Sequence, residues 1–173
     1  MIRPYKGIHP RIDPTAYVDE SAQVIGDVVI GPESSIWPGV VIRGDVNTIR
    51  IGARTNVQDN SVLHVTRRTH PLVLGDDVTV GHAAILHGCT LANLTFIGMG
   101  ATVMDGALIG ELAMVGARAL VTQGREIPPG MLAVGAPAKP VRALTDEERA
   151  VIRQSAINYV EDRLAFMPWD AGE

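Results

Sequence analysis

The sequence is poor in cysteine and in aromatic residues. Its 173 residues include one cysteine, Cys89, which excludes an internal disulfide framework and favours a reducing compartment. Phenylalanine, tryptophan and tyrosine together make up 4% of the chain, although hydrophobic residues make up 46%. The core must therefore be built from valine, isoleucine, leucine and alanine. Such side chains suit a narrow, regular interior, and we expect Cys89 to pack there as a buried thiol.

Basic runs and long apolar runs are also missing. The formal net charge is −4 and no segment is rich in lysine or arginine, so nucleic acid is not an expected partner. No apolar stretch approaches the roughly 20 residues that a membrane helix needs. Residues 1–6 lead into no apolar segment of the kind found in secretory signals. These absences predict a cytoplasmic protein that does not insert into membranes.

The sequence does contain a six-residue repeat. An aliphatic residue recurs every six positions, the fourth residue after it is usually small, and glycine often follows it directly. Hairpin proteins have spacings of about 8–12 residues, and a helical period fails because glycine and β-branched residues crowd every segment. The aliphatic positions are Ile12, Val18, Val24, Ile30, Ile36, Ile42, Ile51, Val57, Leu63, Leu74, Val80, Leu86, Leu91, Ile97, Val103, Ile109, Val115, Val121 and Ile127.

A period of six fits one short strand and one corner. The aliphatic residue and the small residue two positions before the next aliphatic residue both point inward, and the corner carries glycine, aspartate, asparagine or proline. Three such units close a triangular coil, and coils stack with strands about 4.8 Å apart. This predicts an all-β fold, a parallel β-helix with three strands per coil over residues 8–140. We interpret two interruptions of the repeat, near residues 46–50 and 66–73, as loops at corners.

The repeat ends at a segment that contains Pro128, Pro129 and Pro137. Thr145 and Glu148 then have the spacing of a capping box, and apolar residues follow at helical intervals. We therefore expect one amphipathic α-helix over residues 145–166, in the same structural domain as the β-helix. It would pack along a flank of the β-helix or cover its open end.

Histidines are the candidate functional residues. Counting faces along the repeat places Leu63 and Leu86 on the third face of successive coils. His64 and His87 follow these residues directly, so both point outward in one column, about 5 Å apart. That spacing is close enough for the two imidazoles to share a metal ion. His82 follows the second face and projects in another direction.

A threefold trimer would bring the three histidines together. If the third face of one subunit meets the second face of the next, His82 of one chain completes a site with His64 and His87 of the other. Arg43 lies one coil below His64, and Asp59 lies one coil below His82, which predicts an Arg43–Asp59 ion pair across the interface. Three neutral imidazoles with an open fourth position make a catalytic type of zinc site, although iron or cobalt also fits.

A resemblance to a known family rests on four segments: Arg43-Gly44-Asp45, Asn56-Val57-Gln58-Asp59, Leu63-His64, and Gly81-His82 with His87-Gly88-Cys89. On these segments the chain resembles the γ-class carbonic anhydrases, from about residue 8 to the C-terminal helix. The resemblance implies left-handed coiling and a homotrimer with a metal at each interface. It implies that His64, His82 and His87 hold the metal and that CO₂ is hydrated reversibly to bicarbonate. It also implies that Gln58 orients the reactive hydroxide, and it places Arg43, Asp45 and Asp59 in an interfacial polar network.

Some residues depart from the family pattern or have two interpretations. Val46 stands where the archetype has a glutamate that shuttles protons, and His70 is either its substitute or an ordinary exposed loop residue. Tyr159, on the expected helix, could reach the mouth of the site or could serve as a core residue. Asp45 and Asp59 could also act only as turn-capping corner residues.

Other classes of function fit the same scaffold. Hexapeptide acyltransferases use an interfacial histidine as a general base with a CoA carrier, and a metal-dependent thioesterase could use the same metal. The missing acidic shuttle also fits a catalytically weak or non-catalytic metal-binding homologue. Three histidines at metal-compatible positions favour a metal-dependent function over acyl transfer, which usually needs one interfacial histidine. Trp37 and Trp169 are expected to pack at interfaces or ends rather than to bind a ligand.

Overall fold

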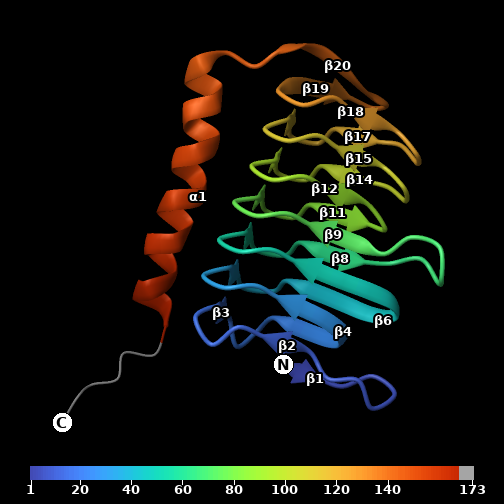
Figure 1. The fold of residues 1–173 in the computed structure, drawn as a ribbon, viewed down its shortest axis with the longest axis vertical. Coiled ribbons are helices and arrows are strands. Elements are labelled where there is room, and N and C mark those ends of the chain that lie inside the picture. Colours follow the sequence, from blue (N-terminus) through green and yellow to red (C-terminus); the bar gives the residue numbers. More distant parts are fainter. Residues whose placement is uncertain (168–173) are drawn as a thin grey trace.

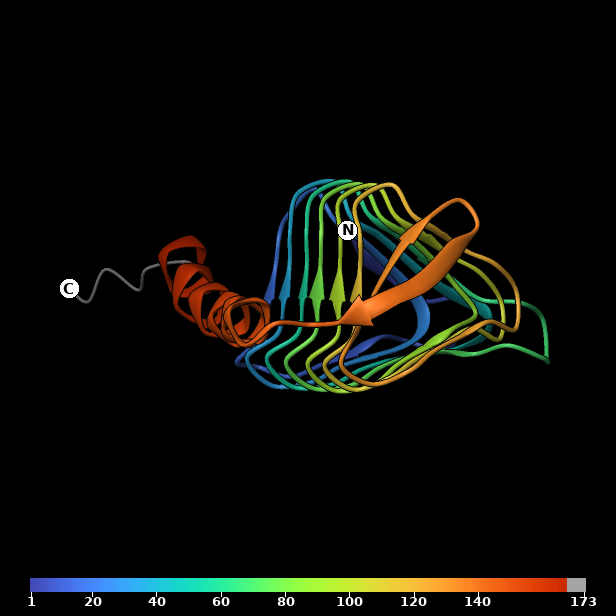
Figure 2. The same ribbon diagram turned by 90° about the horizontal axis from the view of Figure 1, so that it is seen from above.

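A computed structural model describes residues 1–167 and has the form of a parallel β-helix with one α-helix along its side (Figure 1). Seen from above, the coils superpose in a triangular outline, and the helix lies beside one flat face (Figure 2). The predicted all-β fold with three strands per coil and a C-terminal helix is confirmed. Trp169 lies outside the described residues.

Short strands stack by parallel pairing into three faces. The first face contains β2 (Arg11–Ile12), β9 (Leu72–Leu74), β12 (Thr90–Leu91), β15 (Leu108–Ile109) and β18 (Glu126–Ile127). The second contains β3 (Tyr17–Val18), β5 (Ser35–Ile36), β7 (Asn56–Val57), β10 (Thr79–Val80), β13 (Phe96–Ile97), β16 (Met114–Val115) and β19 (Met131–Gly135). The third contains β8 (Val62–His64), β11 (Ile85–His87), β14 (Thr102–Val103) and β17 (Leu120–Val121). At the ends of the stack, β1 (Ile2–Arg3) pairs with β4, and β20 (Ala138–Ala143) pairs antiparallel with β19.

Two long strands join the third face to the first. β4 (Gln23–Ile30) and β6 (Val41–Ile51) run around a corner and pair with each other on both faces. Residues 46–50 are therefore part of a strand, and the prediction of a loop there was wrong. The segment stays extended because β4 offers it paired backbone groups on both sides of the corner. The second interruption does contain a loop, which is closed by a bridge between Thr66 and His70.

The aliphatic residues of the repeat form the core. Each repeat position from Val24 to Ile127 is at most 3% exposed. Cys89 packs in the same cluster, as expected, and burial raises the pKa of its thiol to about 12. Buried hydroxyl groups cross-link the coils where small polar residues point inward, as when Ser34 donates to the carbonyl oxygen of Gly52 at 2.7 Å. This narrow interior leaves no room for aromatic rings, which explains their scarcity.

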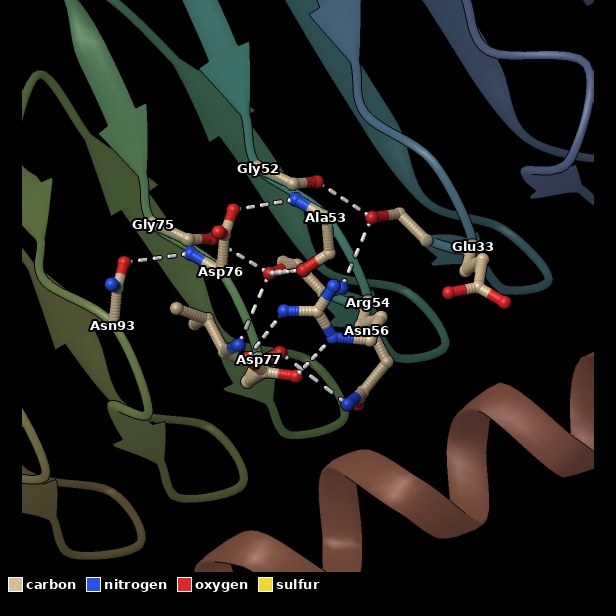
Figure 3. Close-up of polar contacts among 12 residues, drawn as sticks. Glu33, Gly52, Ala53, Arg54, Asn56, Gly75, Asp76, Asp77 and Asn93 are labelled. Carbon is tan, nitrogen blue, oxygen red and sulfur yellow. Dashed lines mark hydrogen bonds and ion pairs between the residues drawn. The ribbon is translucent and has the colours of Figure 1, made fainter.

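Polar side chains hold the coils in register at the corner between the first and second faces (Figure 3). The side chain of Asn93 accepts a hydrogen bond from the backbone of Asp76 at 2.9 Å, and the side chain of Asp76 accepts one from the backbone of Ala53 at 2.8 Å. Arg54 makes two hydrogen bonds to Asp77, at 2.7 and 2.8 Å. Backbone groups that the corners leave unpaired are satisfied in this way.

The helix α1 (Asp146–Phe166) begins at the predicted capping box. The backbone of Glu148 donates to the Thr145 hydroxyl, and the backbone of Thr145 donates to the Glu148 carboxylate. From there α1 runs beside the second face, from the end that carries β20 back toward β3 (Figure 1), and it buries Ile152 and Ala156. Across residues 1–167, no helix combines the length and apolarity that a membrane crossing requires.

Candidate metal centre

His64 and His87 lie one above the other on the third face. β8 and β11 pair in parallel with Leu63 opposite Leu86 and His64 opposite His87. Both leucines are fully buried, so the next residue on each strand points out of the coil. The Nδ1 atom of His64 lies 3.0 Å from the Nε2 atom of His87. The structure therefore brings together two of the three predicted ligands, in the column that the repeat predicted.

A carboxylate holds the other nitrogen of each ring. Asp45, below the pair, lies 3.0 Å from His64 Nε2, and Asp105, above it, lies 2.8 Å from His87 Nδ1. Arg43 forms an ion pair with Asp45, and the Thr66 hydroxyl donates to the Asp105 carboxylate at 2.9 Å. The two rings are thus held at both ends of the column.

The charges of these groups decide which ring nitrogens carry protons. Burial alone would raise the pKa of Asp45 and of Asp105, but the hydrogen bonds they accept from the histidines and from Arg43 or Thr66 lower both values. Burial lowers the pKa of His64. Ionised carboxylates only accept hydrogen bonds, so His64 Nε2 and His87 Nδ1 must donate. In neutral rings the two facing nitrogens then both present lone pairs, an arrangement that a cation or a shared proton between them stabilises.

His82 lies elsewhere in the chain, as predicted. It follows β10 at the corner after the second face, and its Nδ1 atom lies 2.7 Å from Asp59, which sits one coil below. In residues 1–167 no group of three histidine, cysteine or acidic side chains is placed to hold a metal ion. Within one chain Arg43 bonds Asp45 and Asp59 bonds His82, so the predicted Arg43–Asp59 pair stays a prediction about neighbouring subunits.

Gln58 lies near His82 rather than near the His64–His87 pair. Its side chain is 6% exposed and donates to Asn56 at 3.1 Å, and Asn56 in turn donates to the Thr79 hydroxyl at 3.0 Å. That hydroxyl lies 3.1 Å from the hydroxyl of Ser155 on α1. The helix thus helps to fix the Gln58 amide, whose nitrogen is committed and whose oxygen is left to accept a hydrogen bond.

Tyr159 packs between α1 and the β-helix, as expected of a core residue. Its ring packs edge-on against Trp37, with ring centroids 5.5 Å apart, so it joins α1 to the β-helix. Burial, and then the negative charge of Asp59, raise the pKa of its hydroxyl. Tyr159 therefore lies on the side of the molecule that carries Asp59 and His82.

Two residues that depart from the archetype have clear places. Val46 packs against the core and brings no titratable group to the site. His70 is half-buried on the loop after β8, and its Nδ1 atom is buried without a hydrogen-bond partner among the described residues. It is therefore not an ordinary exposed loop residue.

Comparison with known proteins assigns the chain. Over 161 residues it is 48% identical to a carbonic anhydrase of Geobacillus kaustophilus, an alignment that covers 93% of the chain and 88% of that relative. It is 54% identical over 155 residues to the mitochondrial gamma carbonic anhydrase 1 of Arabidopsis thaliana. The chain belongs to the γ-class carbonic anhydrase family. The match covers 87% of the chain but 56% of the plant protein, so the chain spans just over half the length of that relative. No family model matches.

The structural comparison agrees with membership of the γ-class family. A hexapeptide transferase family protein from Anaplasma phagocytophilum superposes with a TM-score of 0.93 at 44% identity, over 96% of this chain and 98% of that one. The fold is thus the left-handed β-helix of hexapeptide-repeat proteins, and the handedness implied by the family resemblance is confirmed.

The donor set fits the zinc expected from the γ-class family. Two nitrogens bound to one tetrahedral zinc ion lie about 3.4 Å apart, so the 3.0 Å between His64 and His87 needs only a small opening. Each of the three histidines has one ring nitrogen on an aspartate, the arrangement that commonly orients metal-binding imidazoles. Sequence reasoning missed Asp105 and Thr66. The repeat register held the signal for Asp105, because Val103 stacks on Leu86 and places Asp105 at the corner above His87.

Proposed function

We propose that this protein hydrates CO₂ reversibly to bicarbonate at metal sites between the subunits of a homotrimer. The observation that carries the proposal is the column of His64 and His87, held between two aspartates with two nitrogens facing each other at 3.0 Å. Membership of the γ-class carbonic anhydrase family supports the reaction. Zinc is the proposed metal, with Fe²⁺ or Co²⁺ as substitutes that imidazole ligands also accept.

The trimer supplies the third ligand in this proposal. His82 is half-exposed and keeps its Nε2 atom free of the Asp59 contact, so it can reach across to the pair of a neighbouring subunit. Val62 and Ile85 on the third face are 38% and 43% exposed, beside the two histidines. Apolar side chains at this exposure next to a candidate site support an interface there.

The residues of the chain then have separate tasks. A zinc ion held by the three histidines would lower the pKa of a bound water to about 7 and would so supply a nucleophile for CO₂ near neutral pH. Gln58 presents its free amide oxygen to orient that nucleophile, and Asn56 keeps the amide from turning. Arg43 and Asp59 would form an ion pair beside the metal. Because Val46 is not titratable, the released proton leaves through buffer or through His70.

The experiment combines metal analysis with stopped-flow CO₂ hydration on anaerobically purified protein. We expect about one zinc ion per chain and a rate well above that of buffer. His64→Ala and His87→Ala should each lose both, and the exposed His9→Ala should lose neither. A metal-replete trimer that hydrates CO₂ no faster than buffer would contradict the lyase activity and leave a non-catalytic metal-binding protein.

A second candidate function is acyl transfer or thioester hydrolysis. It is favoured by a pocket of about 250 Å³ whose lining is almost wholly apolar and which includes Gln58, His82, Phe96 and Met99. A hexapeptide transferase family protein also shares the fold. Calorimetric titration with acetyl-CoA separates the two candidates, since the lyase should bind none. The lone buried Cys89 supports a reducing compartment, and we propose the cytoplasm.

A further inference from the structure

We infer that Asp105 is a positioning residue of the metal centre, which fixes the proton of His87 on Nδ1 and so directs the lone pair of Nε2 toward the metal. This inference rests on the proposed metal function. None of the segments that indicated the family contains Asp105. It reaches the site from the coil above His87, on the corner that follows β14.

The contacts of Asp105 orient its carboxylate to accept a hydrogen bond from His87 Nδ1. Its Oδ1 atom lies 2.8 Å from His87 Nδ1, and the Thr66 hydroxyl donates to both carboxylate oxygens, at 3.0 and 2.9 Å. The Thr66 contacts fix the plane of the carboxylate. A carboxylate that is held in this way and is ionised can only accept the Nδ1 proton of a neutral His87 ring. The metal-facing nitrogen is therefore left unprotonated.

The chain makes room for this contact at Gly88. A Cβ atom there would overlap Asp105 Oδ1 and would lie 2.7 Å from the Cβ atom of His70. A Cβ atom at Gly106 would likewise lie 3.3 Å from the ring of His70. His70 thus closes over the corner where Asp105 sits, and the glycines let carboxylate and ring approach. The side chain of Asp76 packs over Gly52 at another corner in the same way, and at Gly88 this packing places the carboxylate of Asp105 on His87.

Without Asp105, the imidazole rings of His64 and His87 could form a hydrogen bond directly to each other. His64 must keep its proton on Nε2 for Asp45, so its Nδ1 atom is an acceptor facing His87. If Asp105 is removed, His87 can move its proton to Nε2 and donate to that acceptor across 3.0 Å. The metal-free pair would then be internally satisfied. Metal binding would have to break that hydrogen bond, and affinity should fall.

The first test reads the tautomer directly in metal-free protein at a pH where the rings are neutral. Long-range ¹H–¹⁵N correlation spectra should show His87 as the Nδ1–H form in wild type and in Asp105→Asn, whose amide oxygen can still accept. In Asp105→Ala they should show the Nε2–H form. An unchanged Nδ1–H form in Asp105→Ala overturns the inference. This reading needs no metal, so it stands even if the wild-type protein binds no zinc and the proposed function fails.

The second test measures zinc affinity by competition with a chromophoric chelator. We expect Asp105→Ala to weaken binding about 10- to 100-fold, the range typical of such outer partners, and Asp105→Asn to weaken it less. Asp77→Ala, which removes the ion pair with Arg54 at another corner, is the matched control and should bind as wild type does. If Asp105→Ala does not fold, Thr66→Val should show a smaller loss in the same direction. Wild-type affinity in these variants would overturn the inference.

Discussion

The Nδ1 atom of His64 faces the Nε2 atom of His87 at 3.0 Å, and a carboxylate holds the far nitrogen of each ring. The shared column follows from the register: β8 and β11 are parallel neighbours, so equivalent positions after a buried leucine lie one above the other. A slip of one residue would turn one ring into the core. The β-helix can therefore place two imidazole side chains as accurately as it stacks its core.

The first prediction concerns the third face as an interface. Ile85→Asp puts a charge on an exposed apolar position beside His87, and the variant should be monomeric because a buried unpaired carboxylate opposes association. Leu108→Asp changes a similarly exposed residue on the first face and should remain a trimer of three times 18.5 kDa. Sedimentation equilibrium distinguishes the two masses. A trimeric Ile85→Asp protein would show that this face is not the interface.

A second prediction separates two effects of a substitution at Gly88, the backbone strain and the displacement of the Asp105 side chain. Gly88 and Gly124 both have positive φ, +55° and +66°, but only Gly88 lacks space for a Cβ atom. Gly124→Ala should cost only the strain of the left-handed region, about 1–2 kcal/mol. Gly88→Ala should cost more and should also weaken zinc binding, because the new methyl group displaces Asp105. Urea unfolding and chelator competition measure the two effects, and equal losses of stability with intact zinc binding would contradict the prediction.

Much of this site can be predicted from the register of the six-residue repeat. The repeat places His64 beneath His87 and Asp59 beneath His82 before any coordinates exist, and the Thr145–Glu148 spacing locates the start of α1. These features depend on local register and local capping, which a sequence carries explicitly. The loop predicted near residues 66–73 has the same basis, because the six-residue spacing is interrupted there, and the structure closes it with the Thr66–His70 bridge.

Other features depend on how separate segments meet. Residues 46–50 interrupt the repeat yet stay in β6, because pairing with β4 continues around the corner and composition does not reveal it. Asp105 comes 18 residues after His87, so the register places it above that ring, but the hydrogen bond also needs the space that Gly88 leaves. The proposed third ligand, His82, would come from a neighbouring chain, and the sequence of one chain does not show directly how that neighbour approaches. The features that the six-residue repeat does not predict are therefore determined by contacts between separate segments and between chains.

A third prediction concerns pH and the start of α1. Hydrogen bonds from Arg142, and then from the backbone of Thr145, lower the pKa of Glu148 from 4.5 to about 2. The folded value lies below the unfolded one, so the carboxylate stabilises the fold above about pH 4.5, and this contribution is lost as the pH falls toward 2. Glu148→Gln should therefore be less stable than wild type at pH 7, and the difference in stability should narrow steadily as the pH falls from 4.5 to 2.5. Urea unfolding across this range checks it, with the exposed Glu111→Gln as control; a gap that does not change with pH would contradict it.

The last prediction separates the stability of the core from the geometry of the metal centre. Ile109 is 1% exposed on the first face, and Leu63 is fully buried directly before His64. Replacing either with alanine removes buried methyl groups and leaves a cavity, at a cost of about 2–5 kcal/mol. Only Leu63→Ala also lets the strand that carries His64 shift, and a misplaced ring would change the 3.0 Å separation that the proposed zinc site needs. Urea unfolding at one protein concentration should therefore show similar losses for both variants, while chelator competition should show weaker zinc binding in Leu63→Ala alone. Equal zinc affinity in the two variants would mean that the aspartates, and not the packing beneath the strand, set the position of His64.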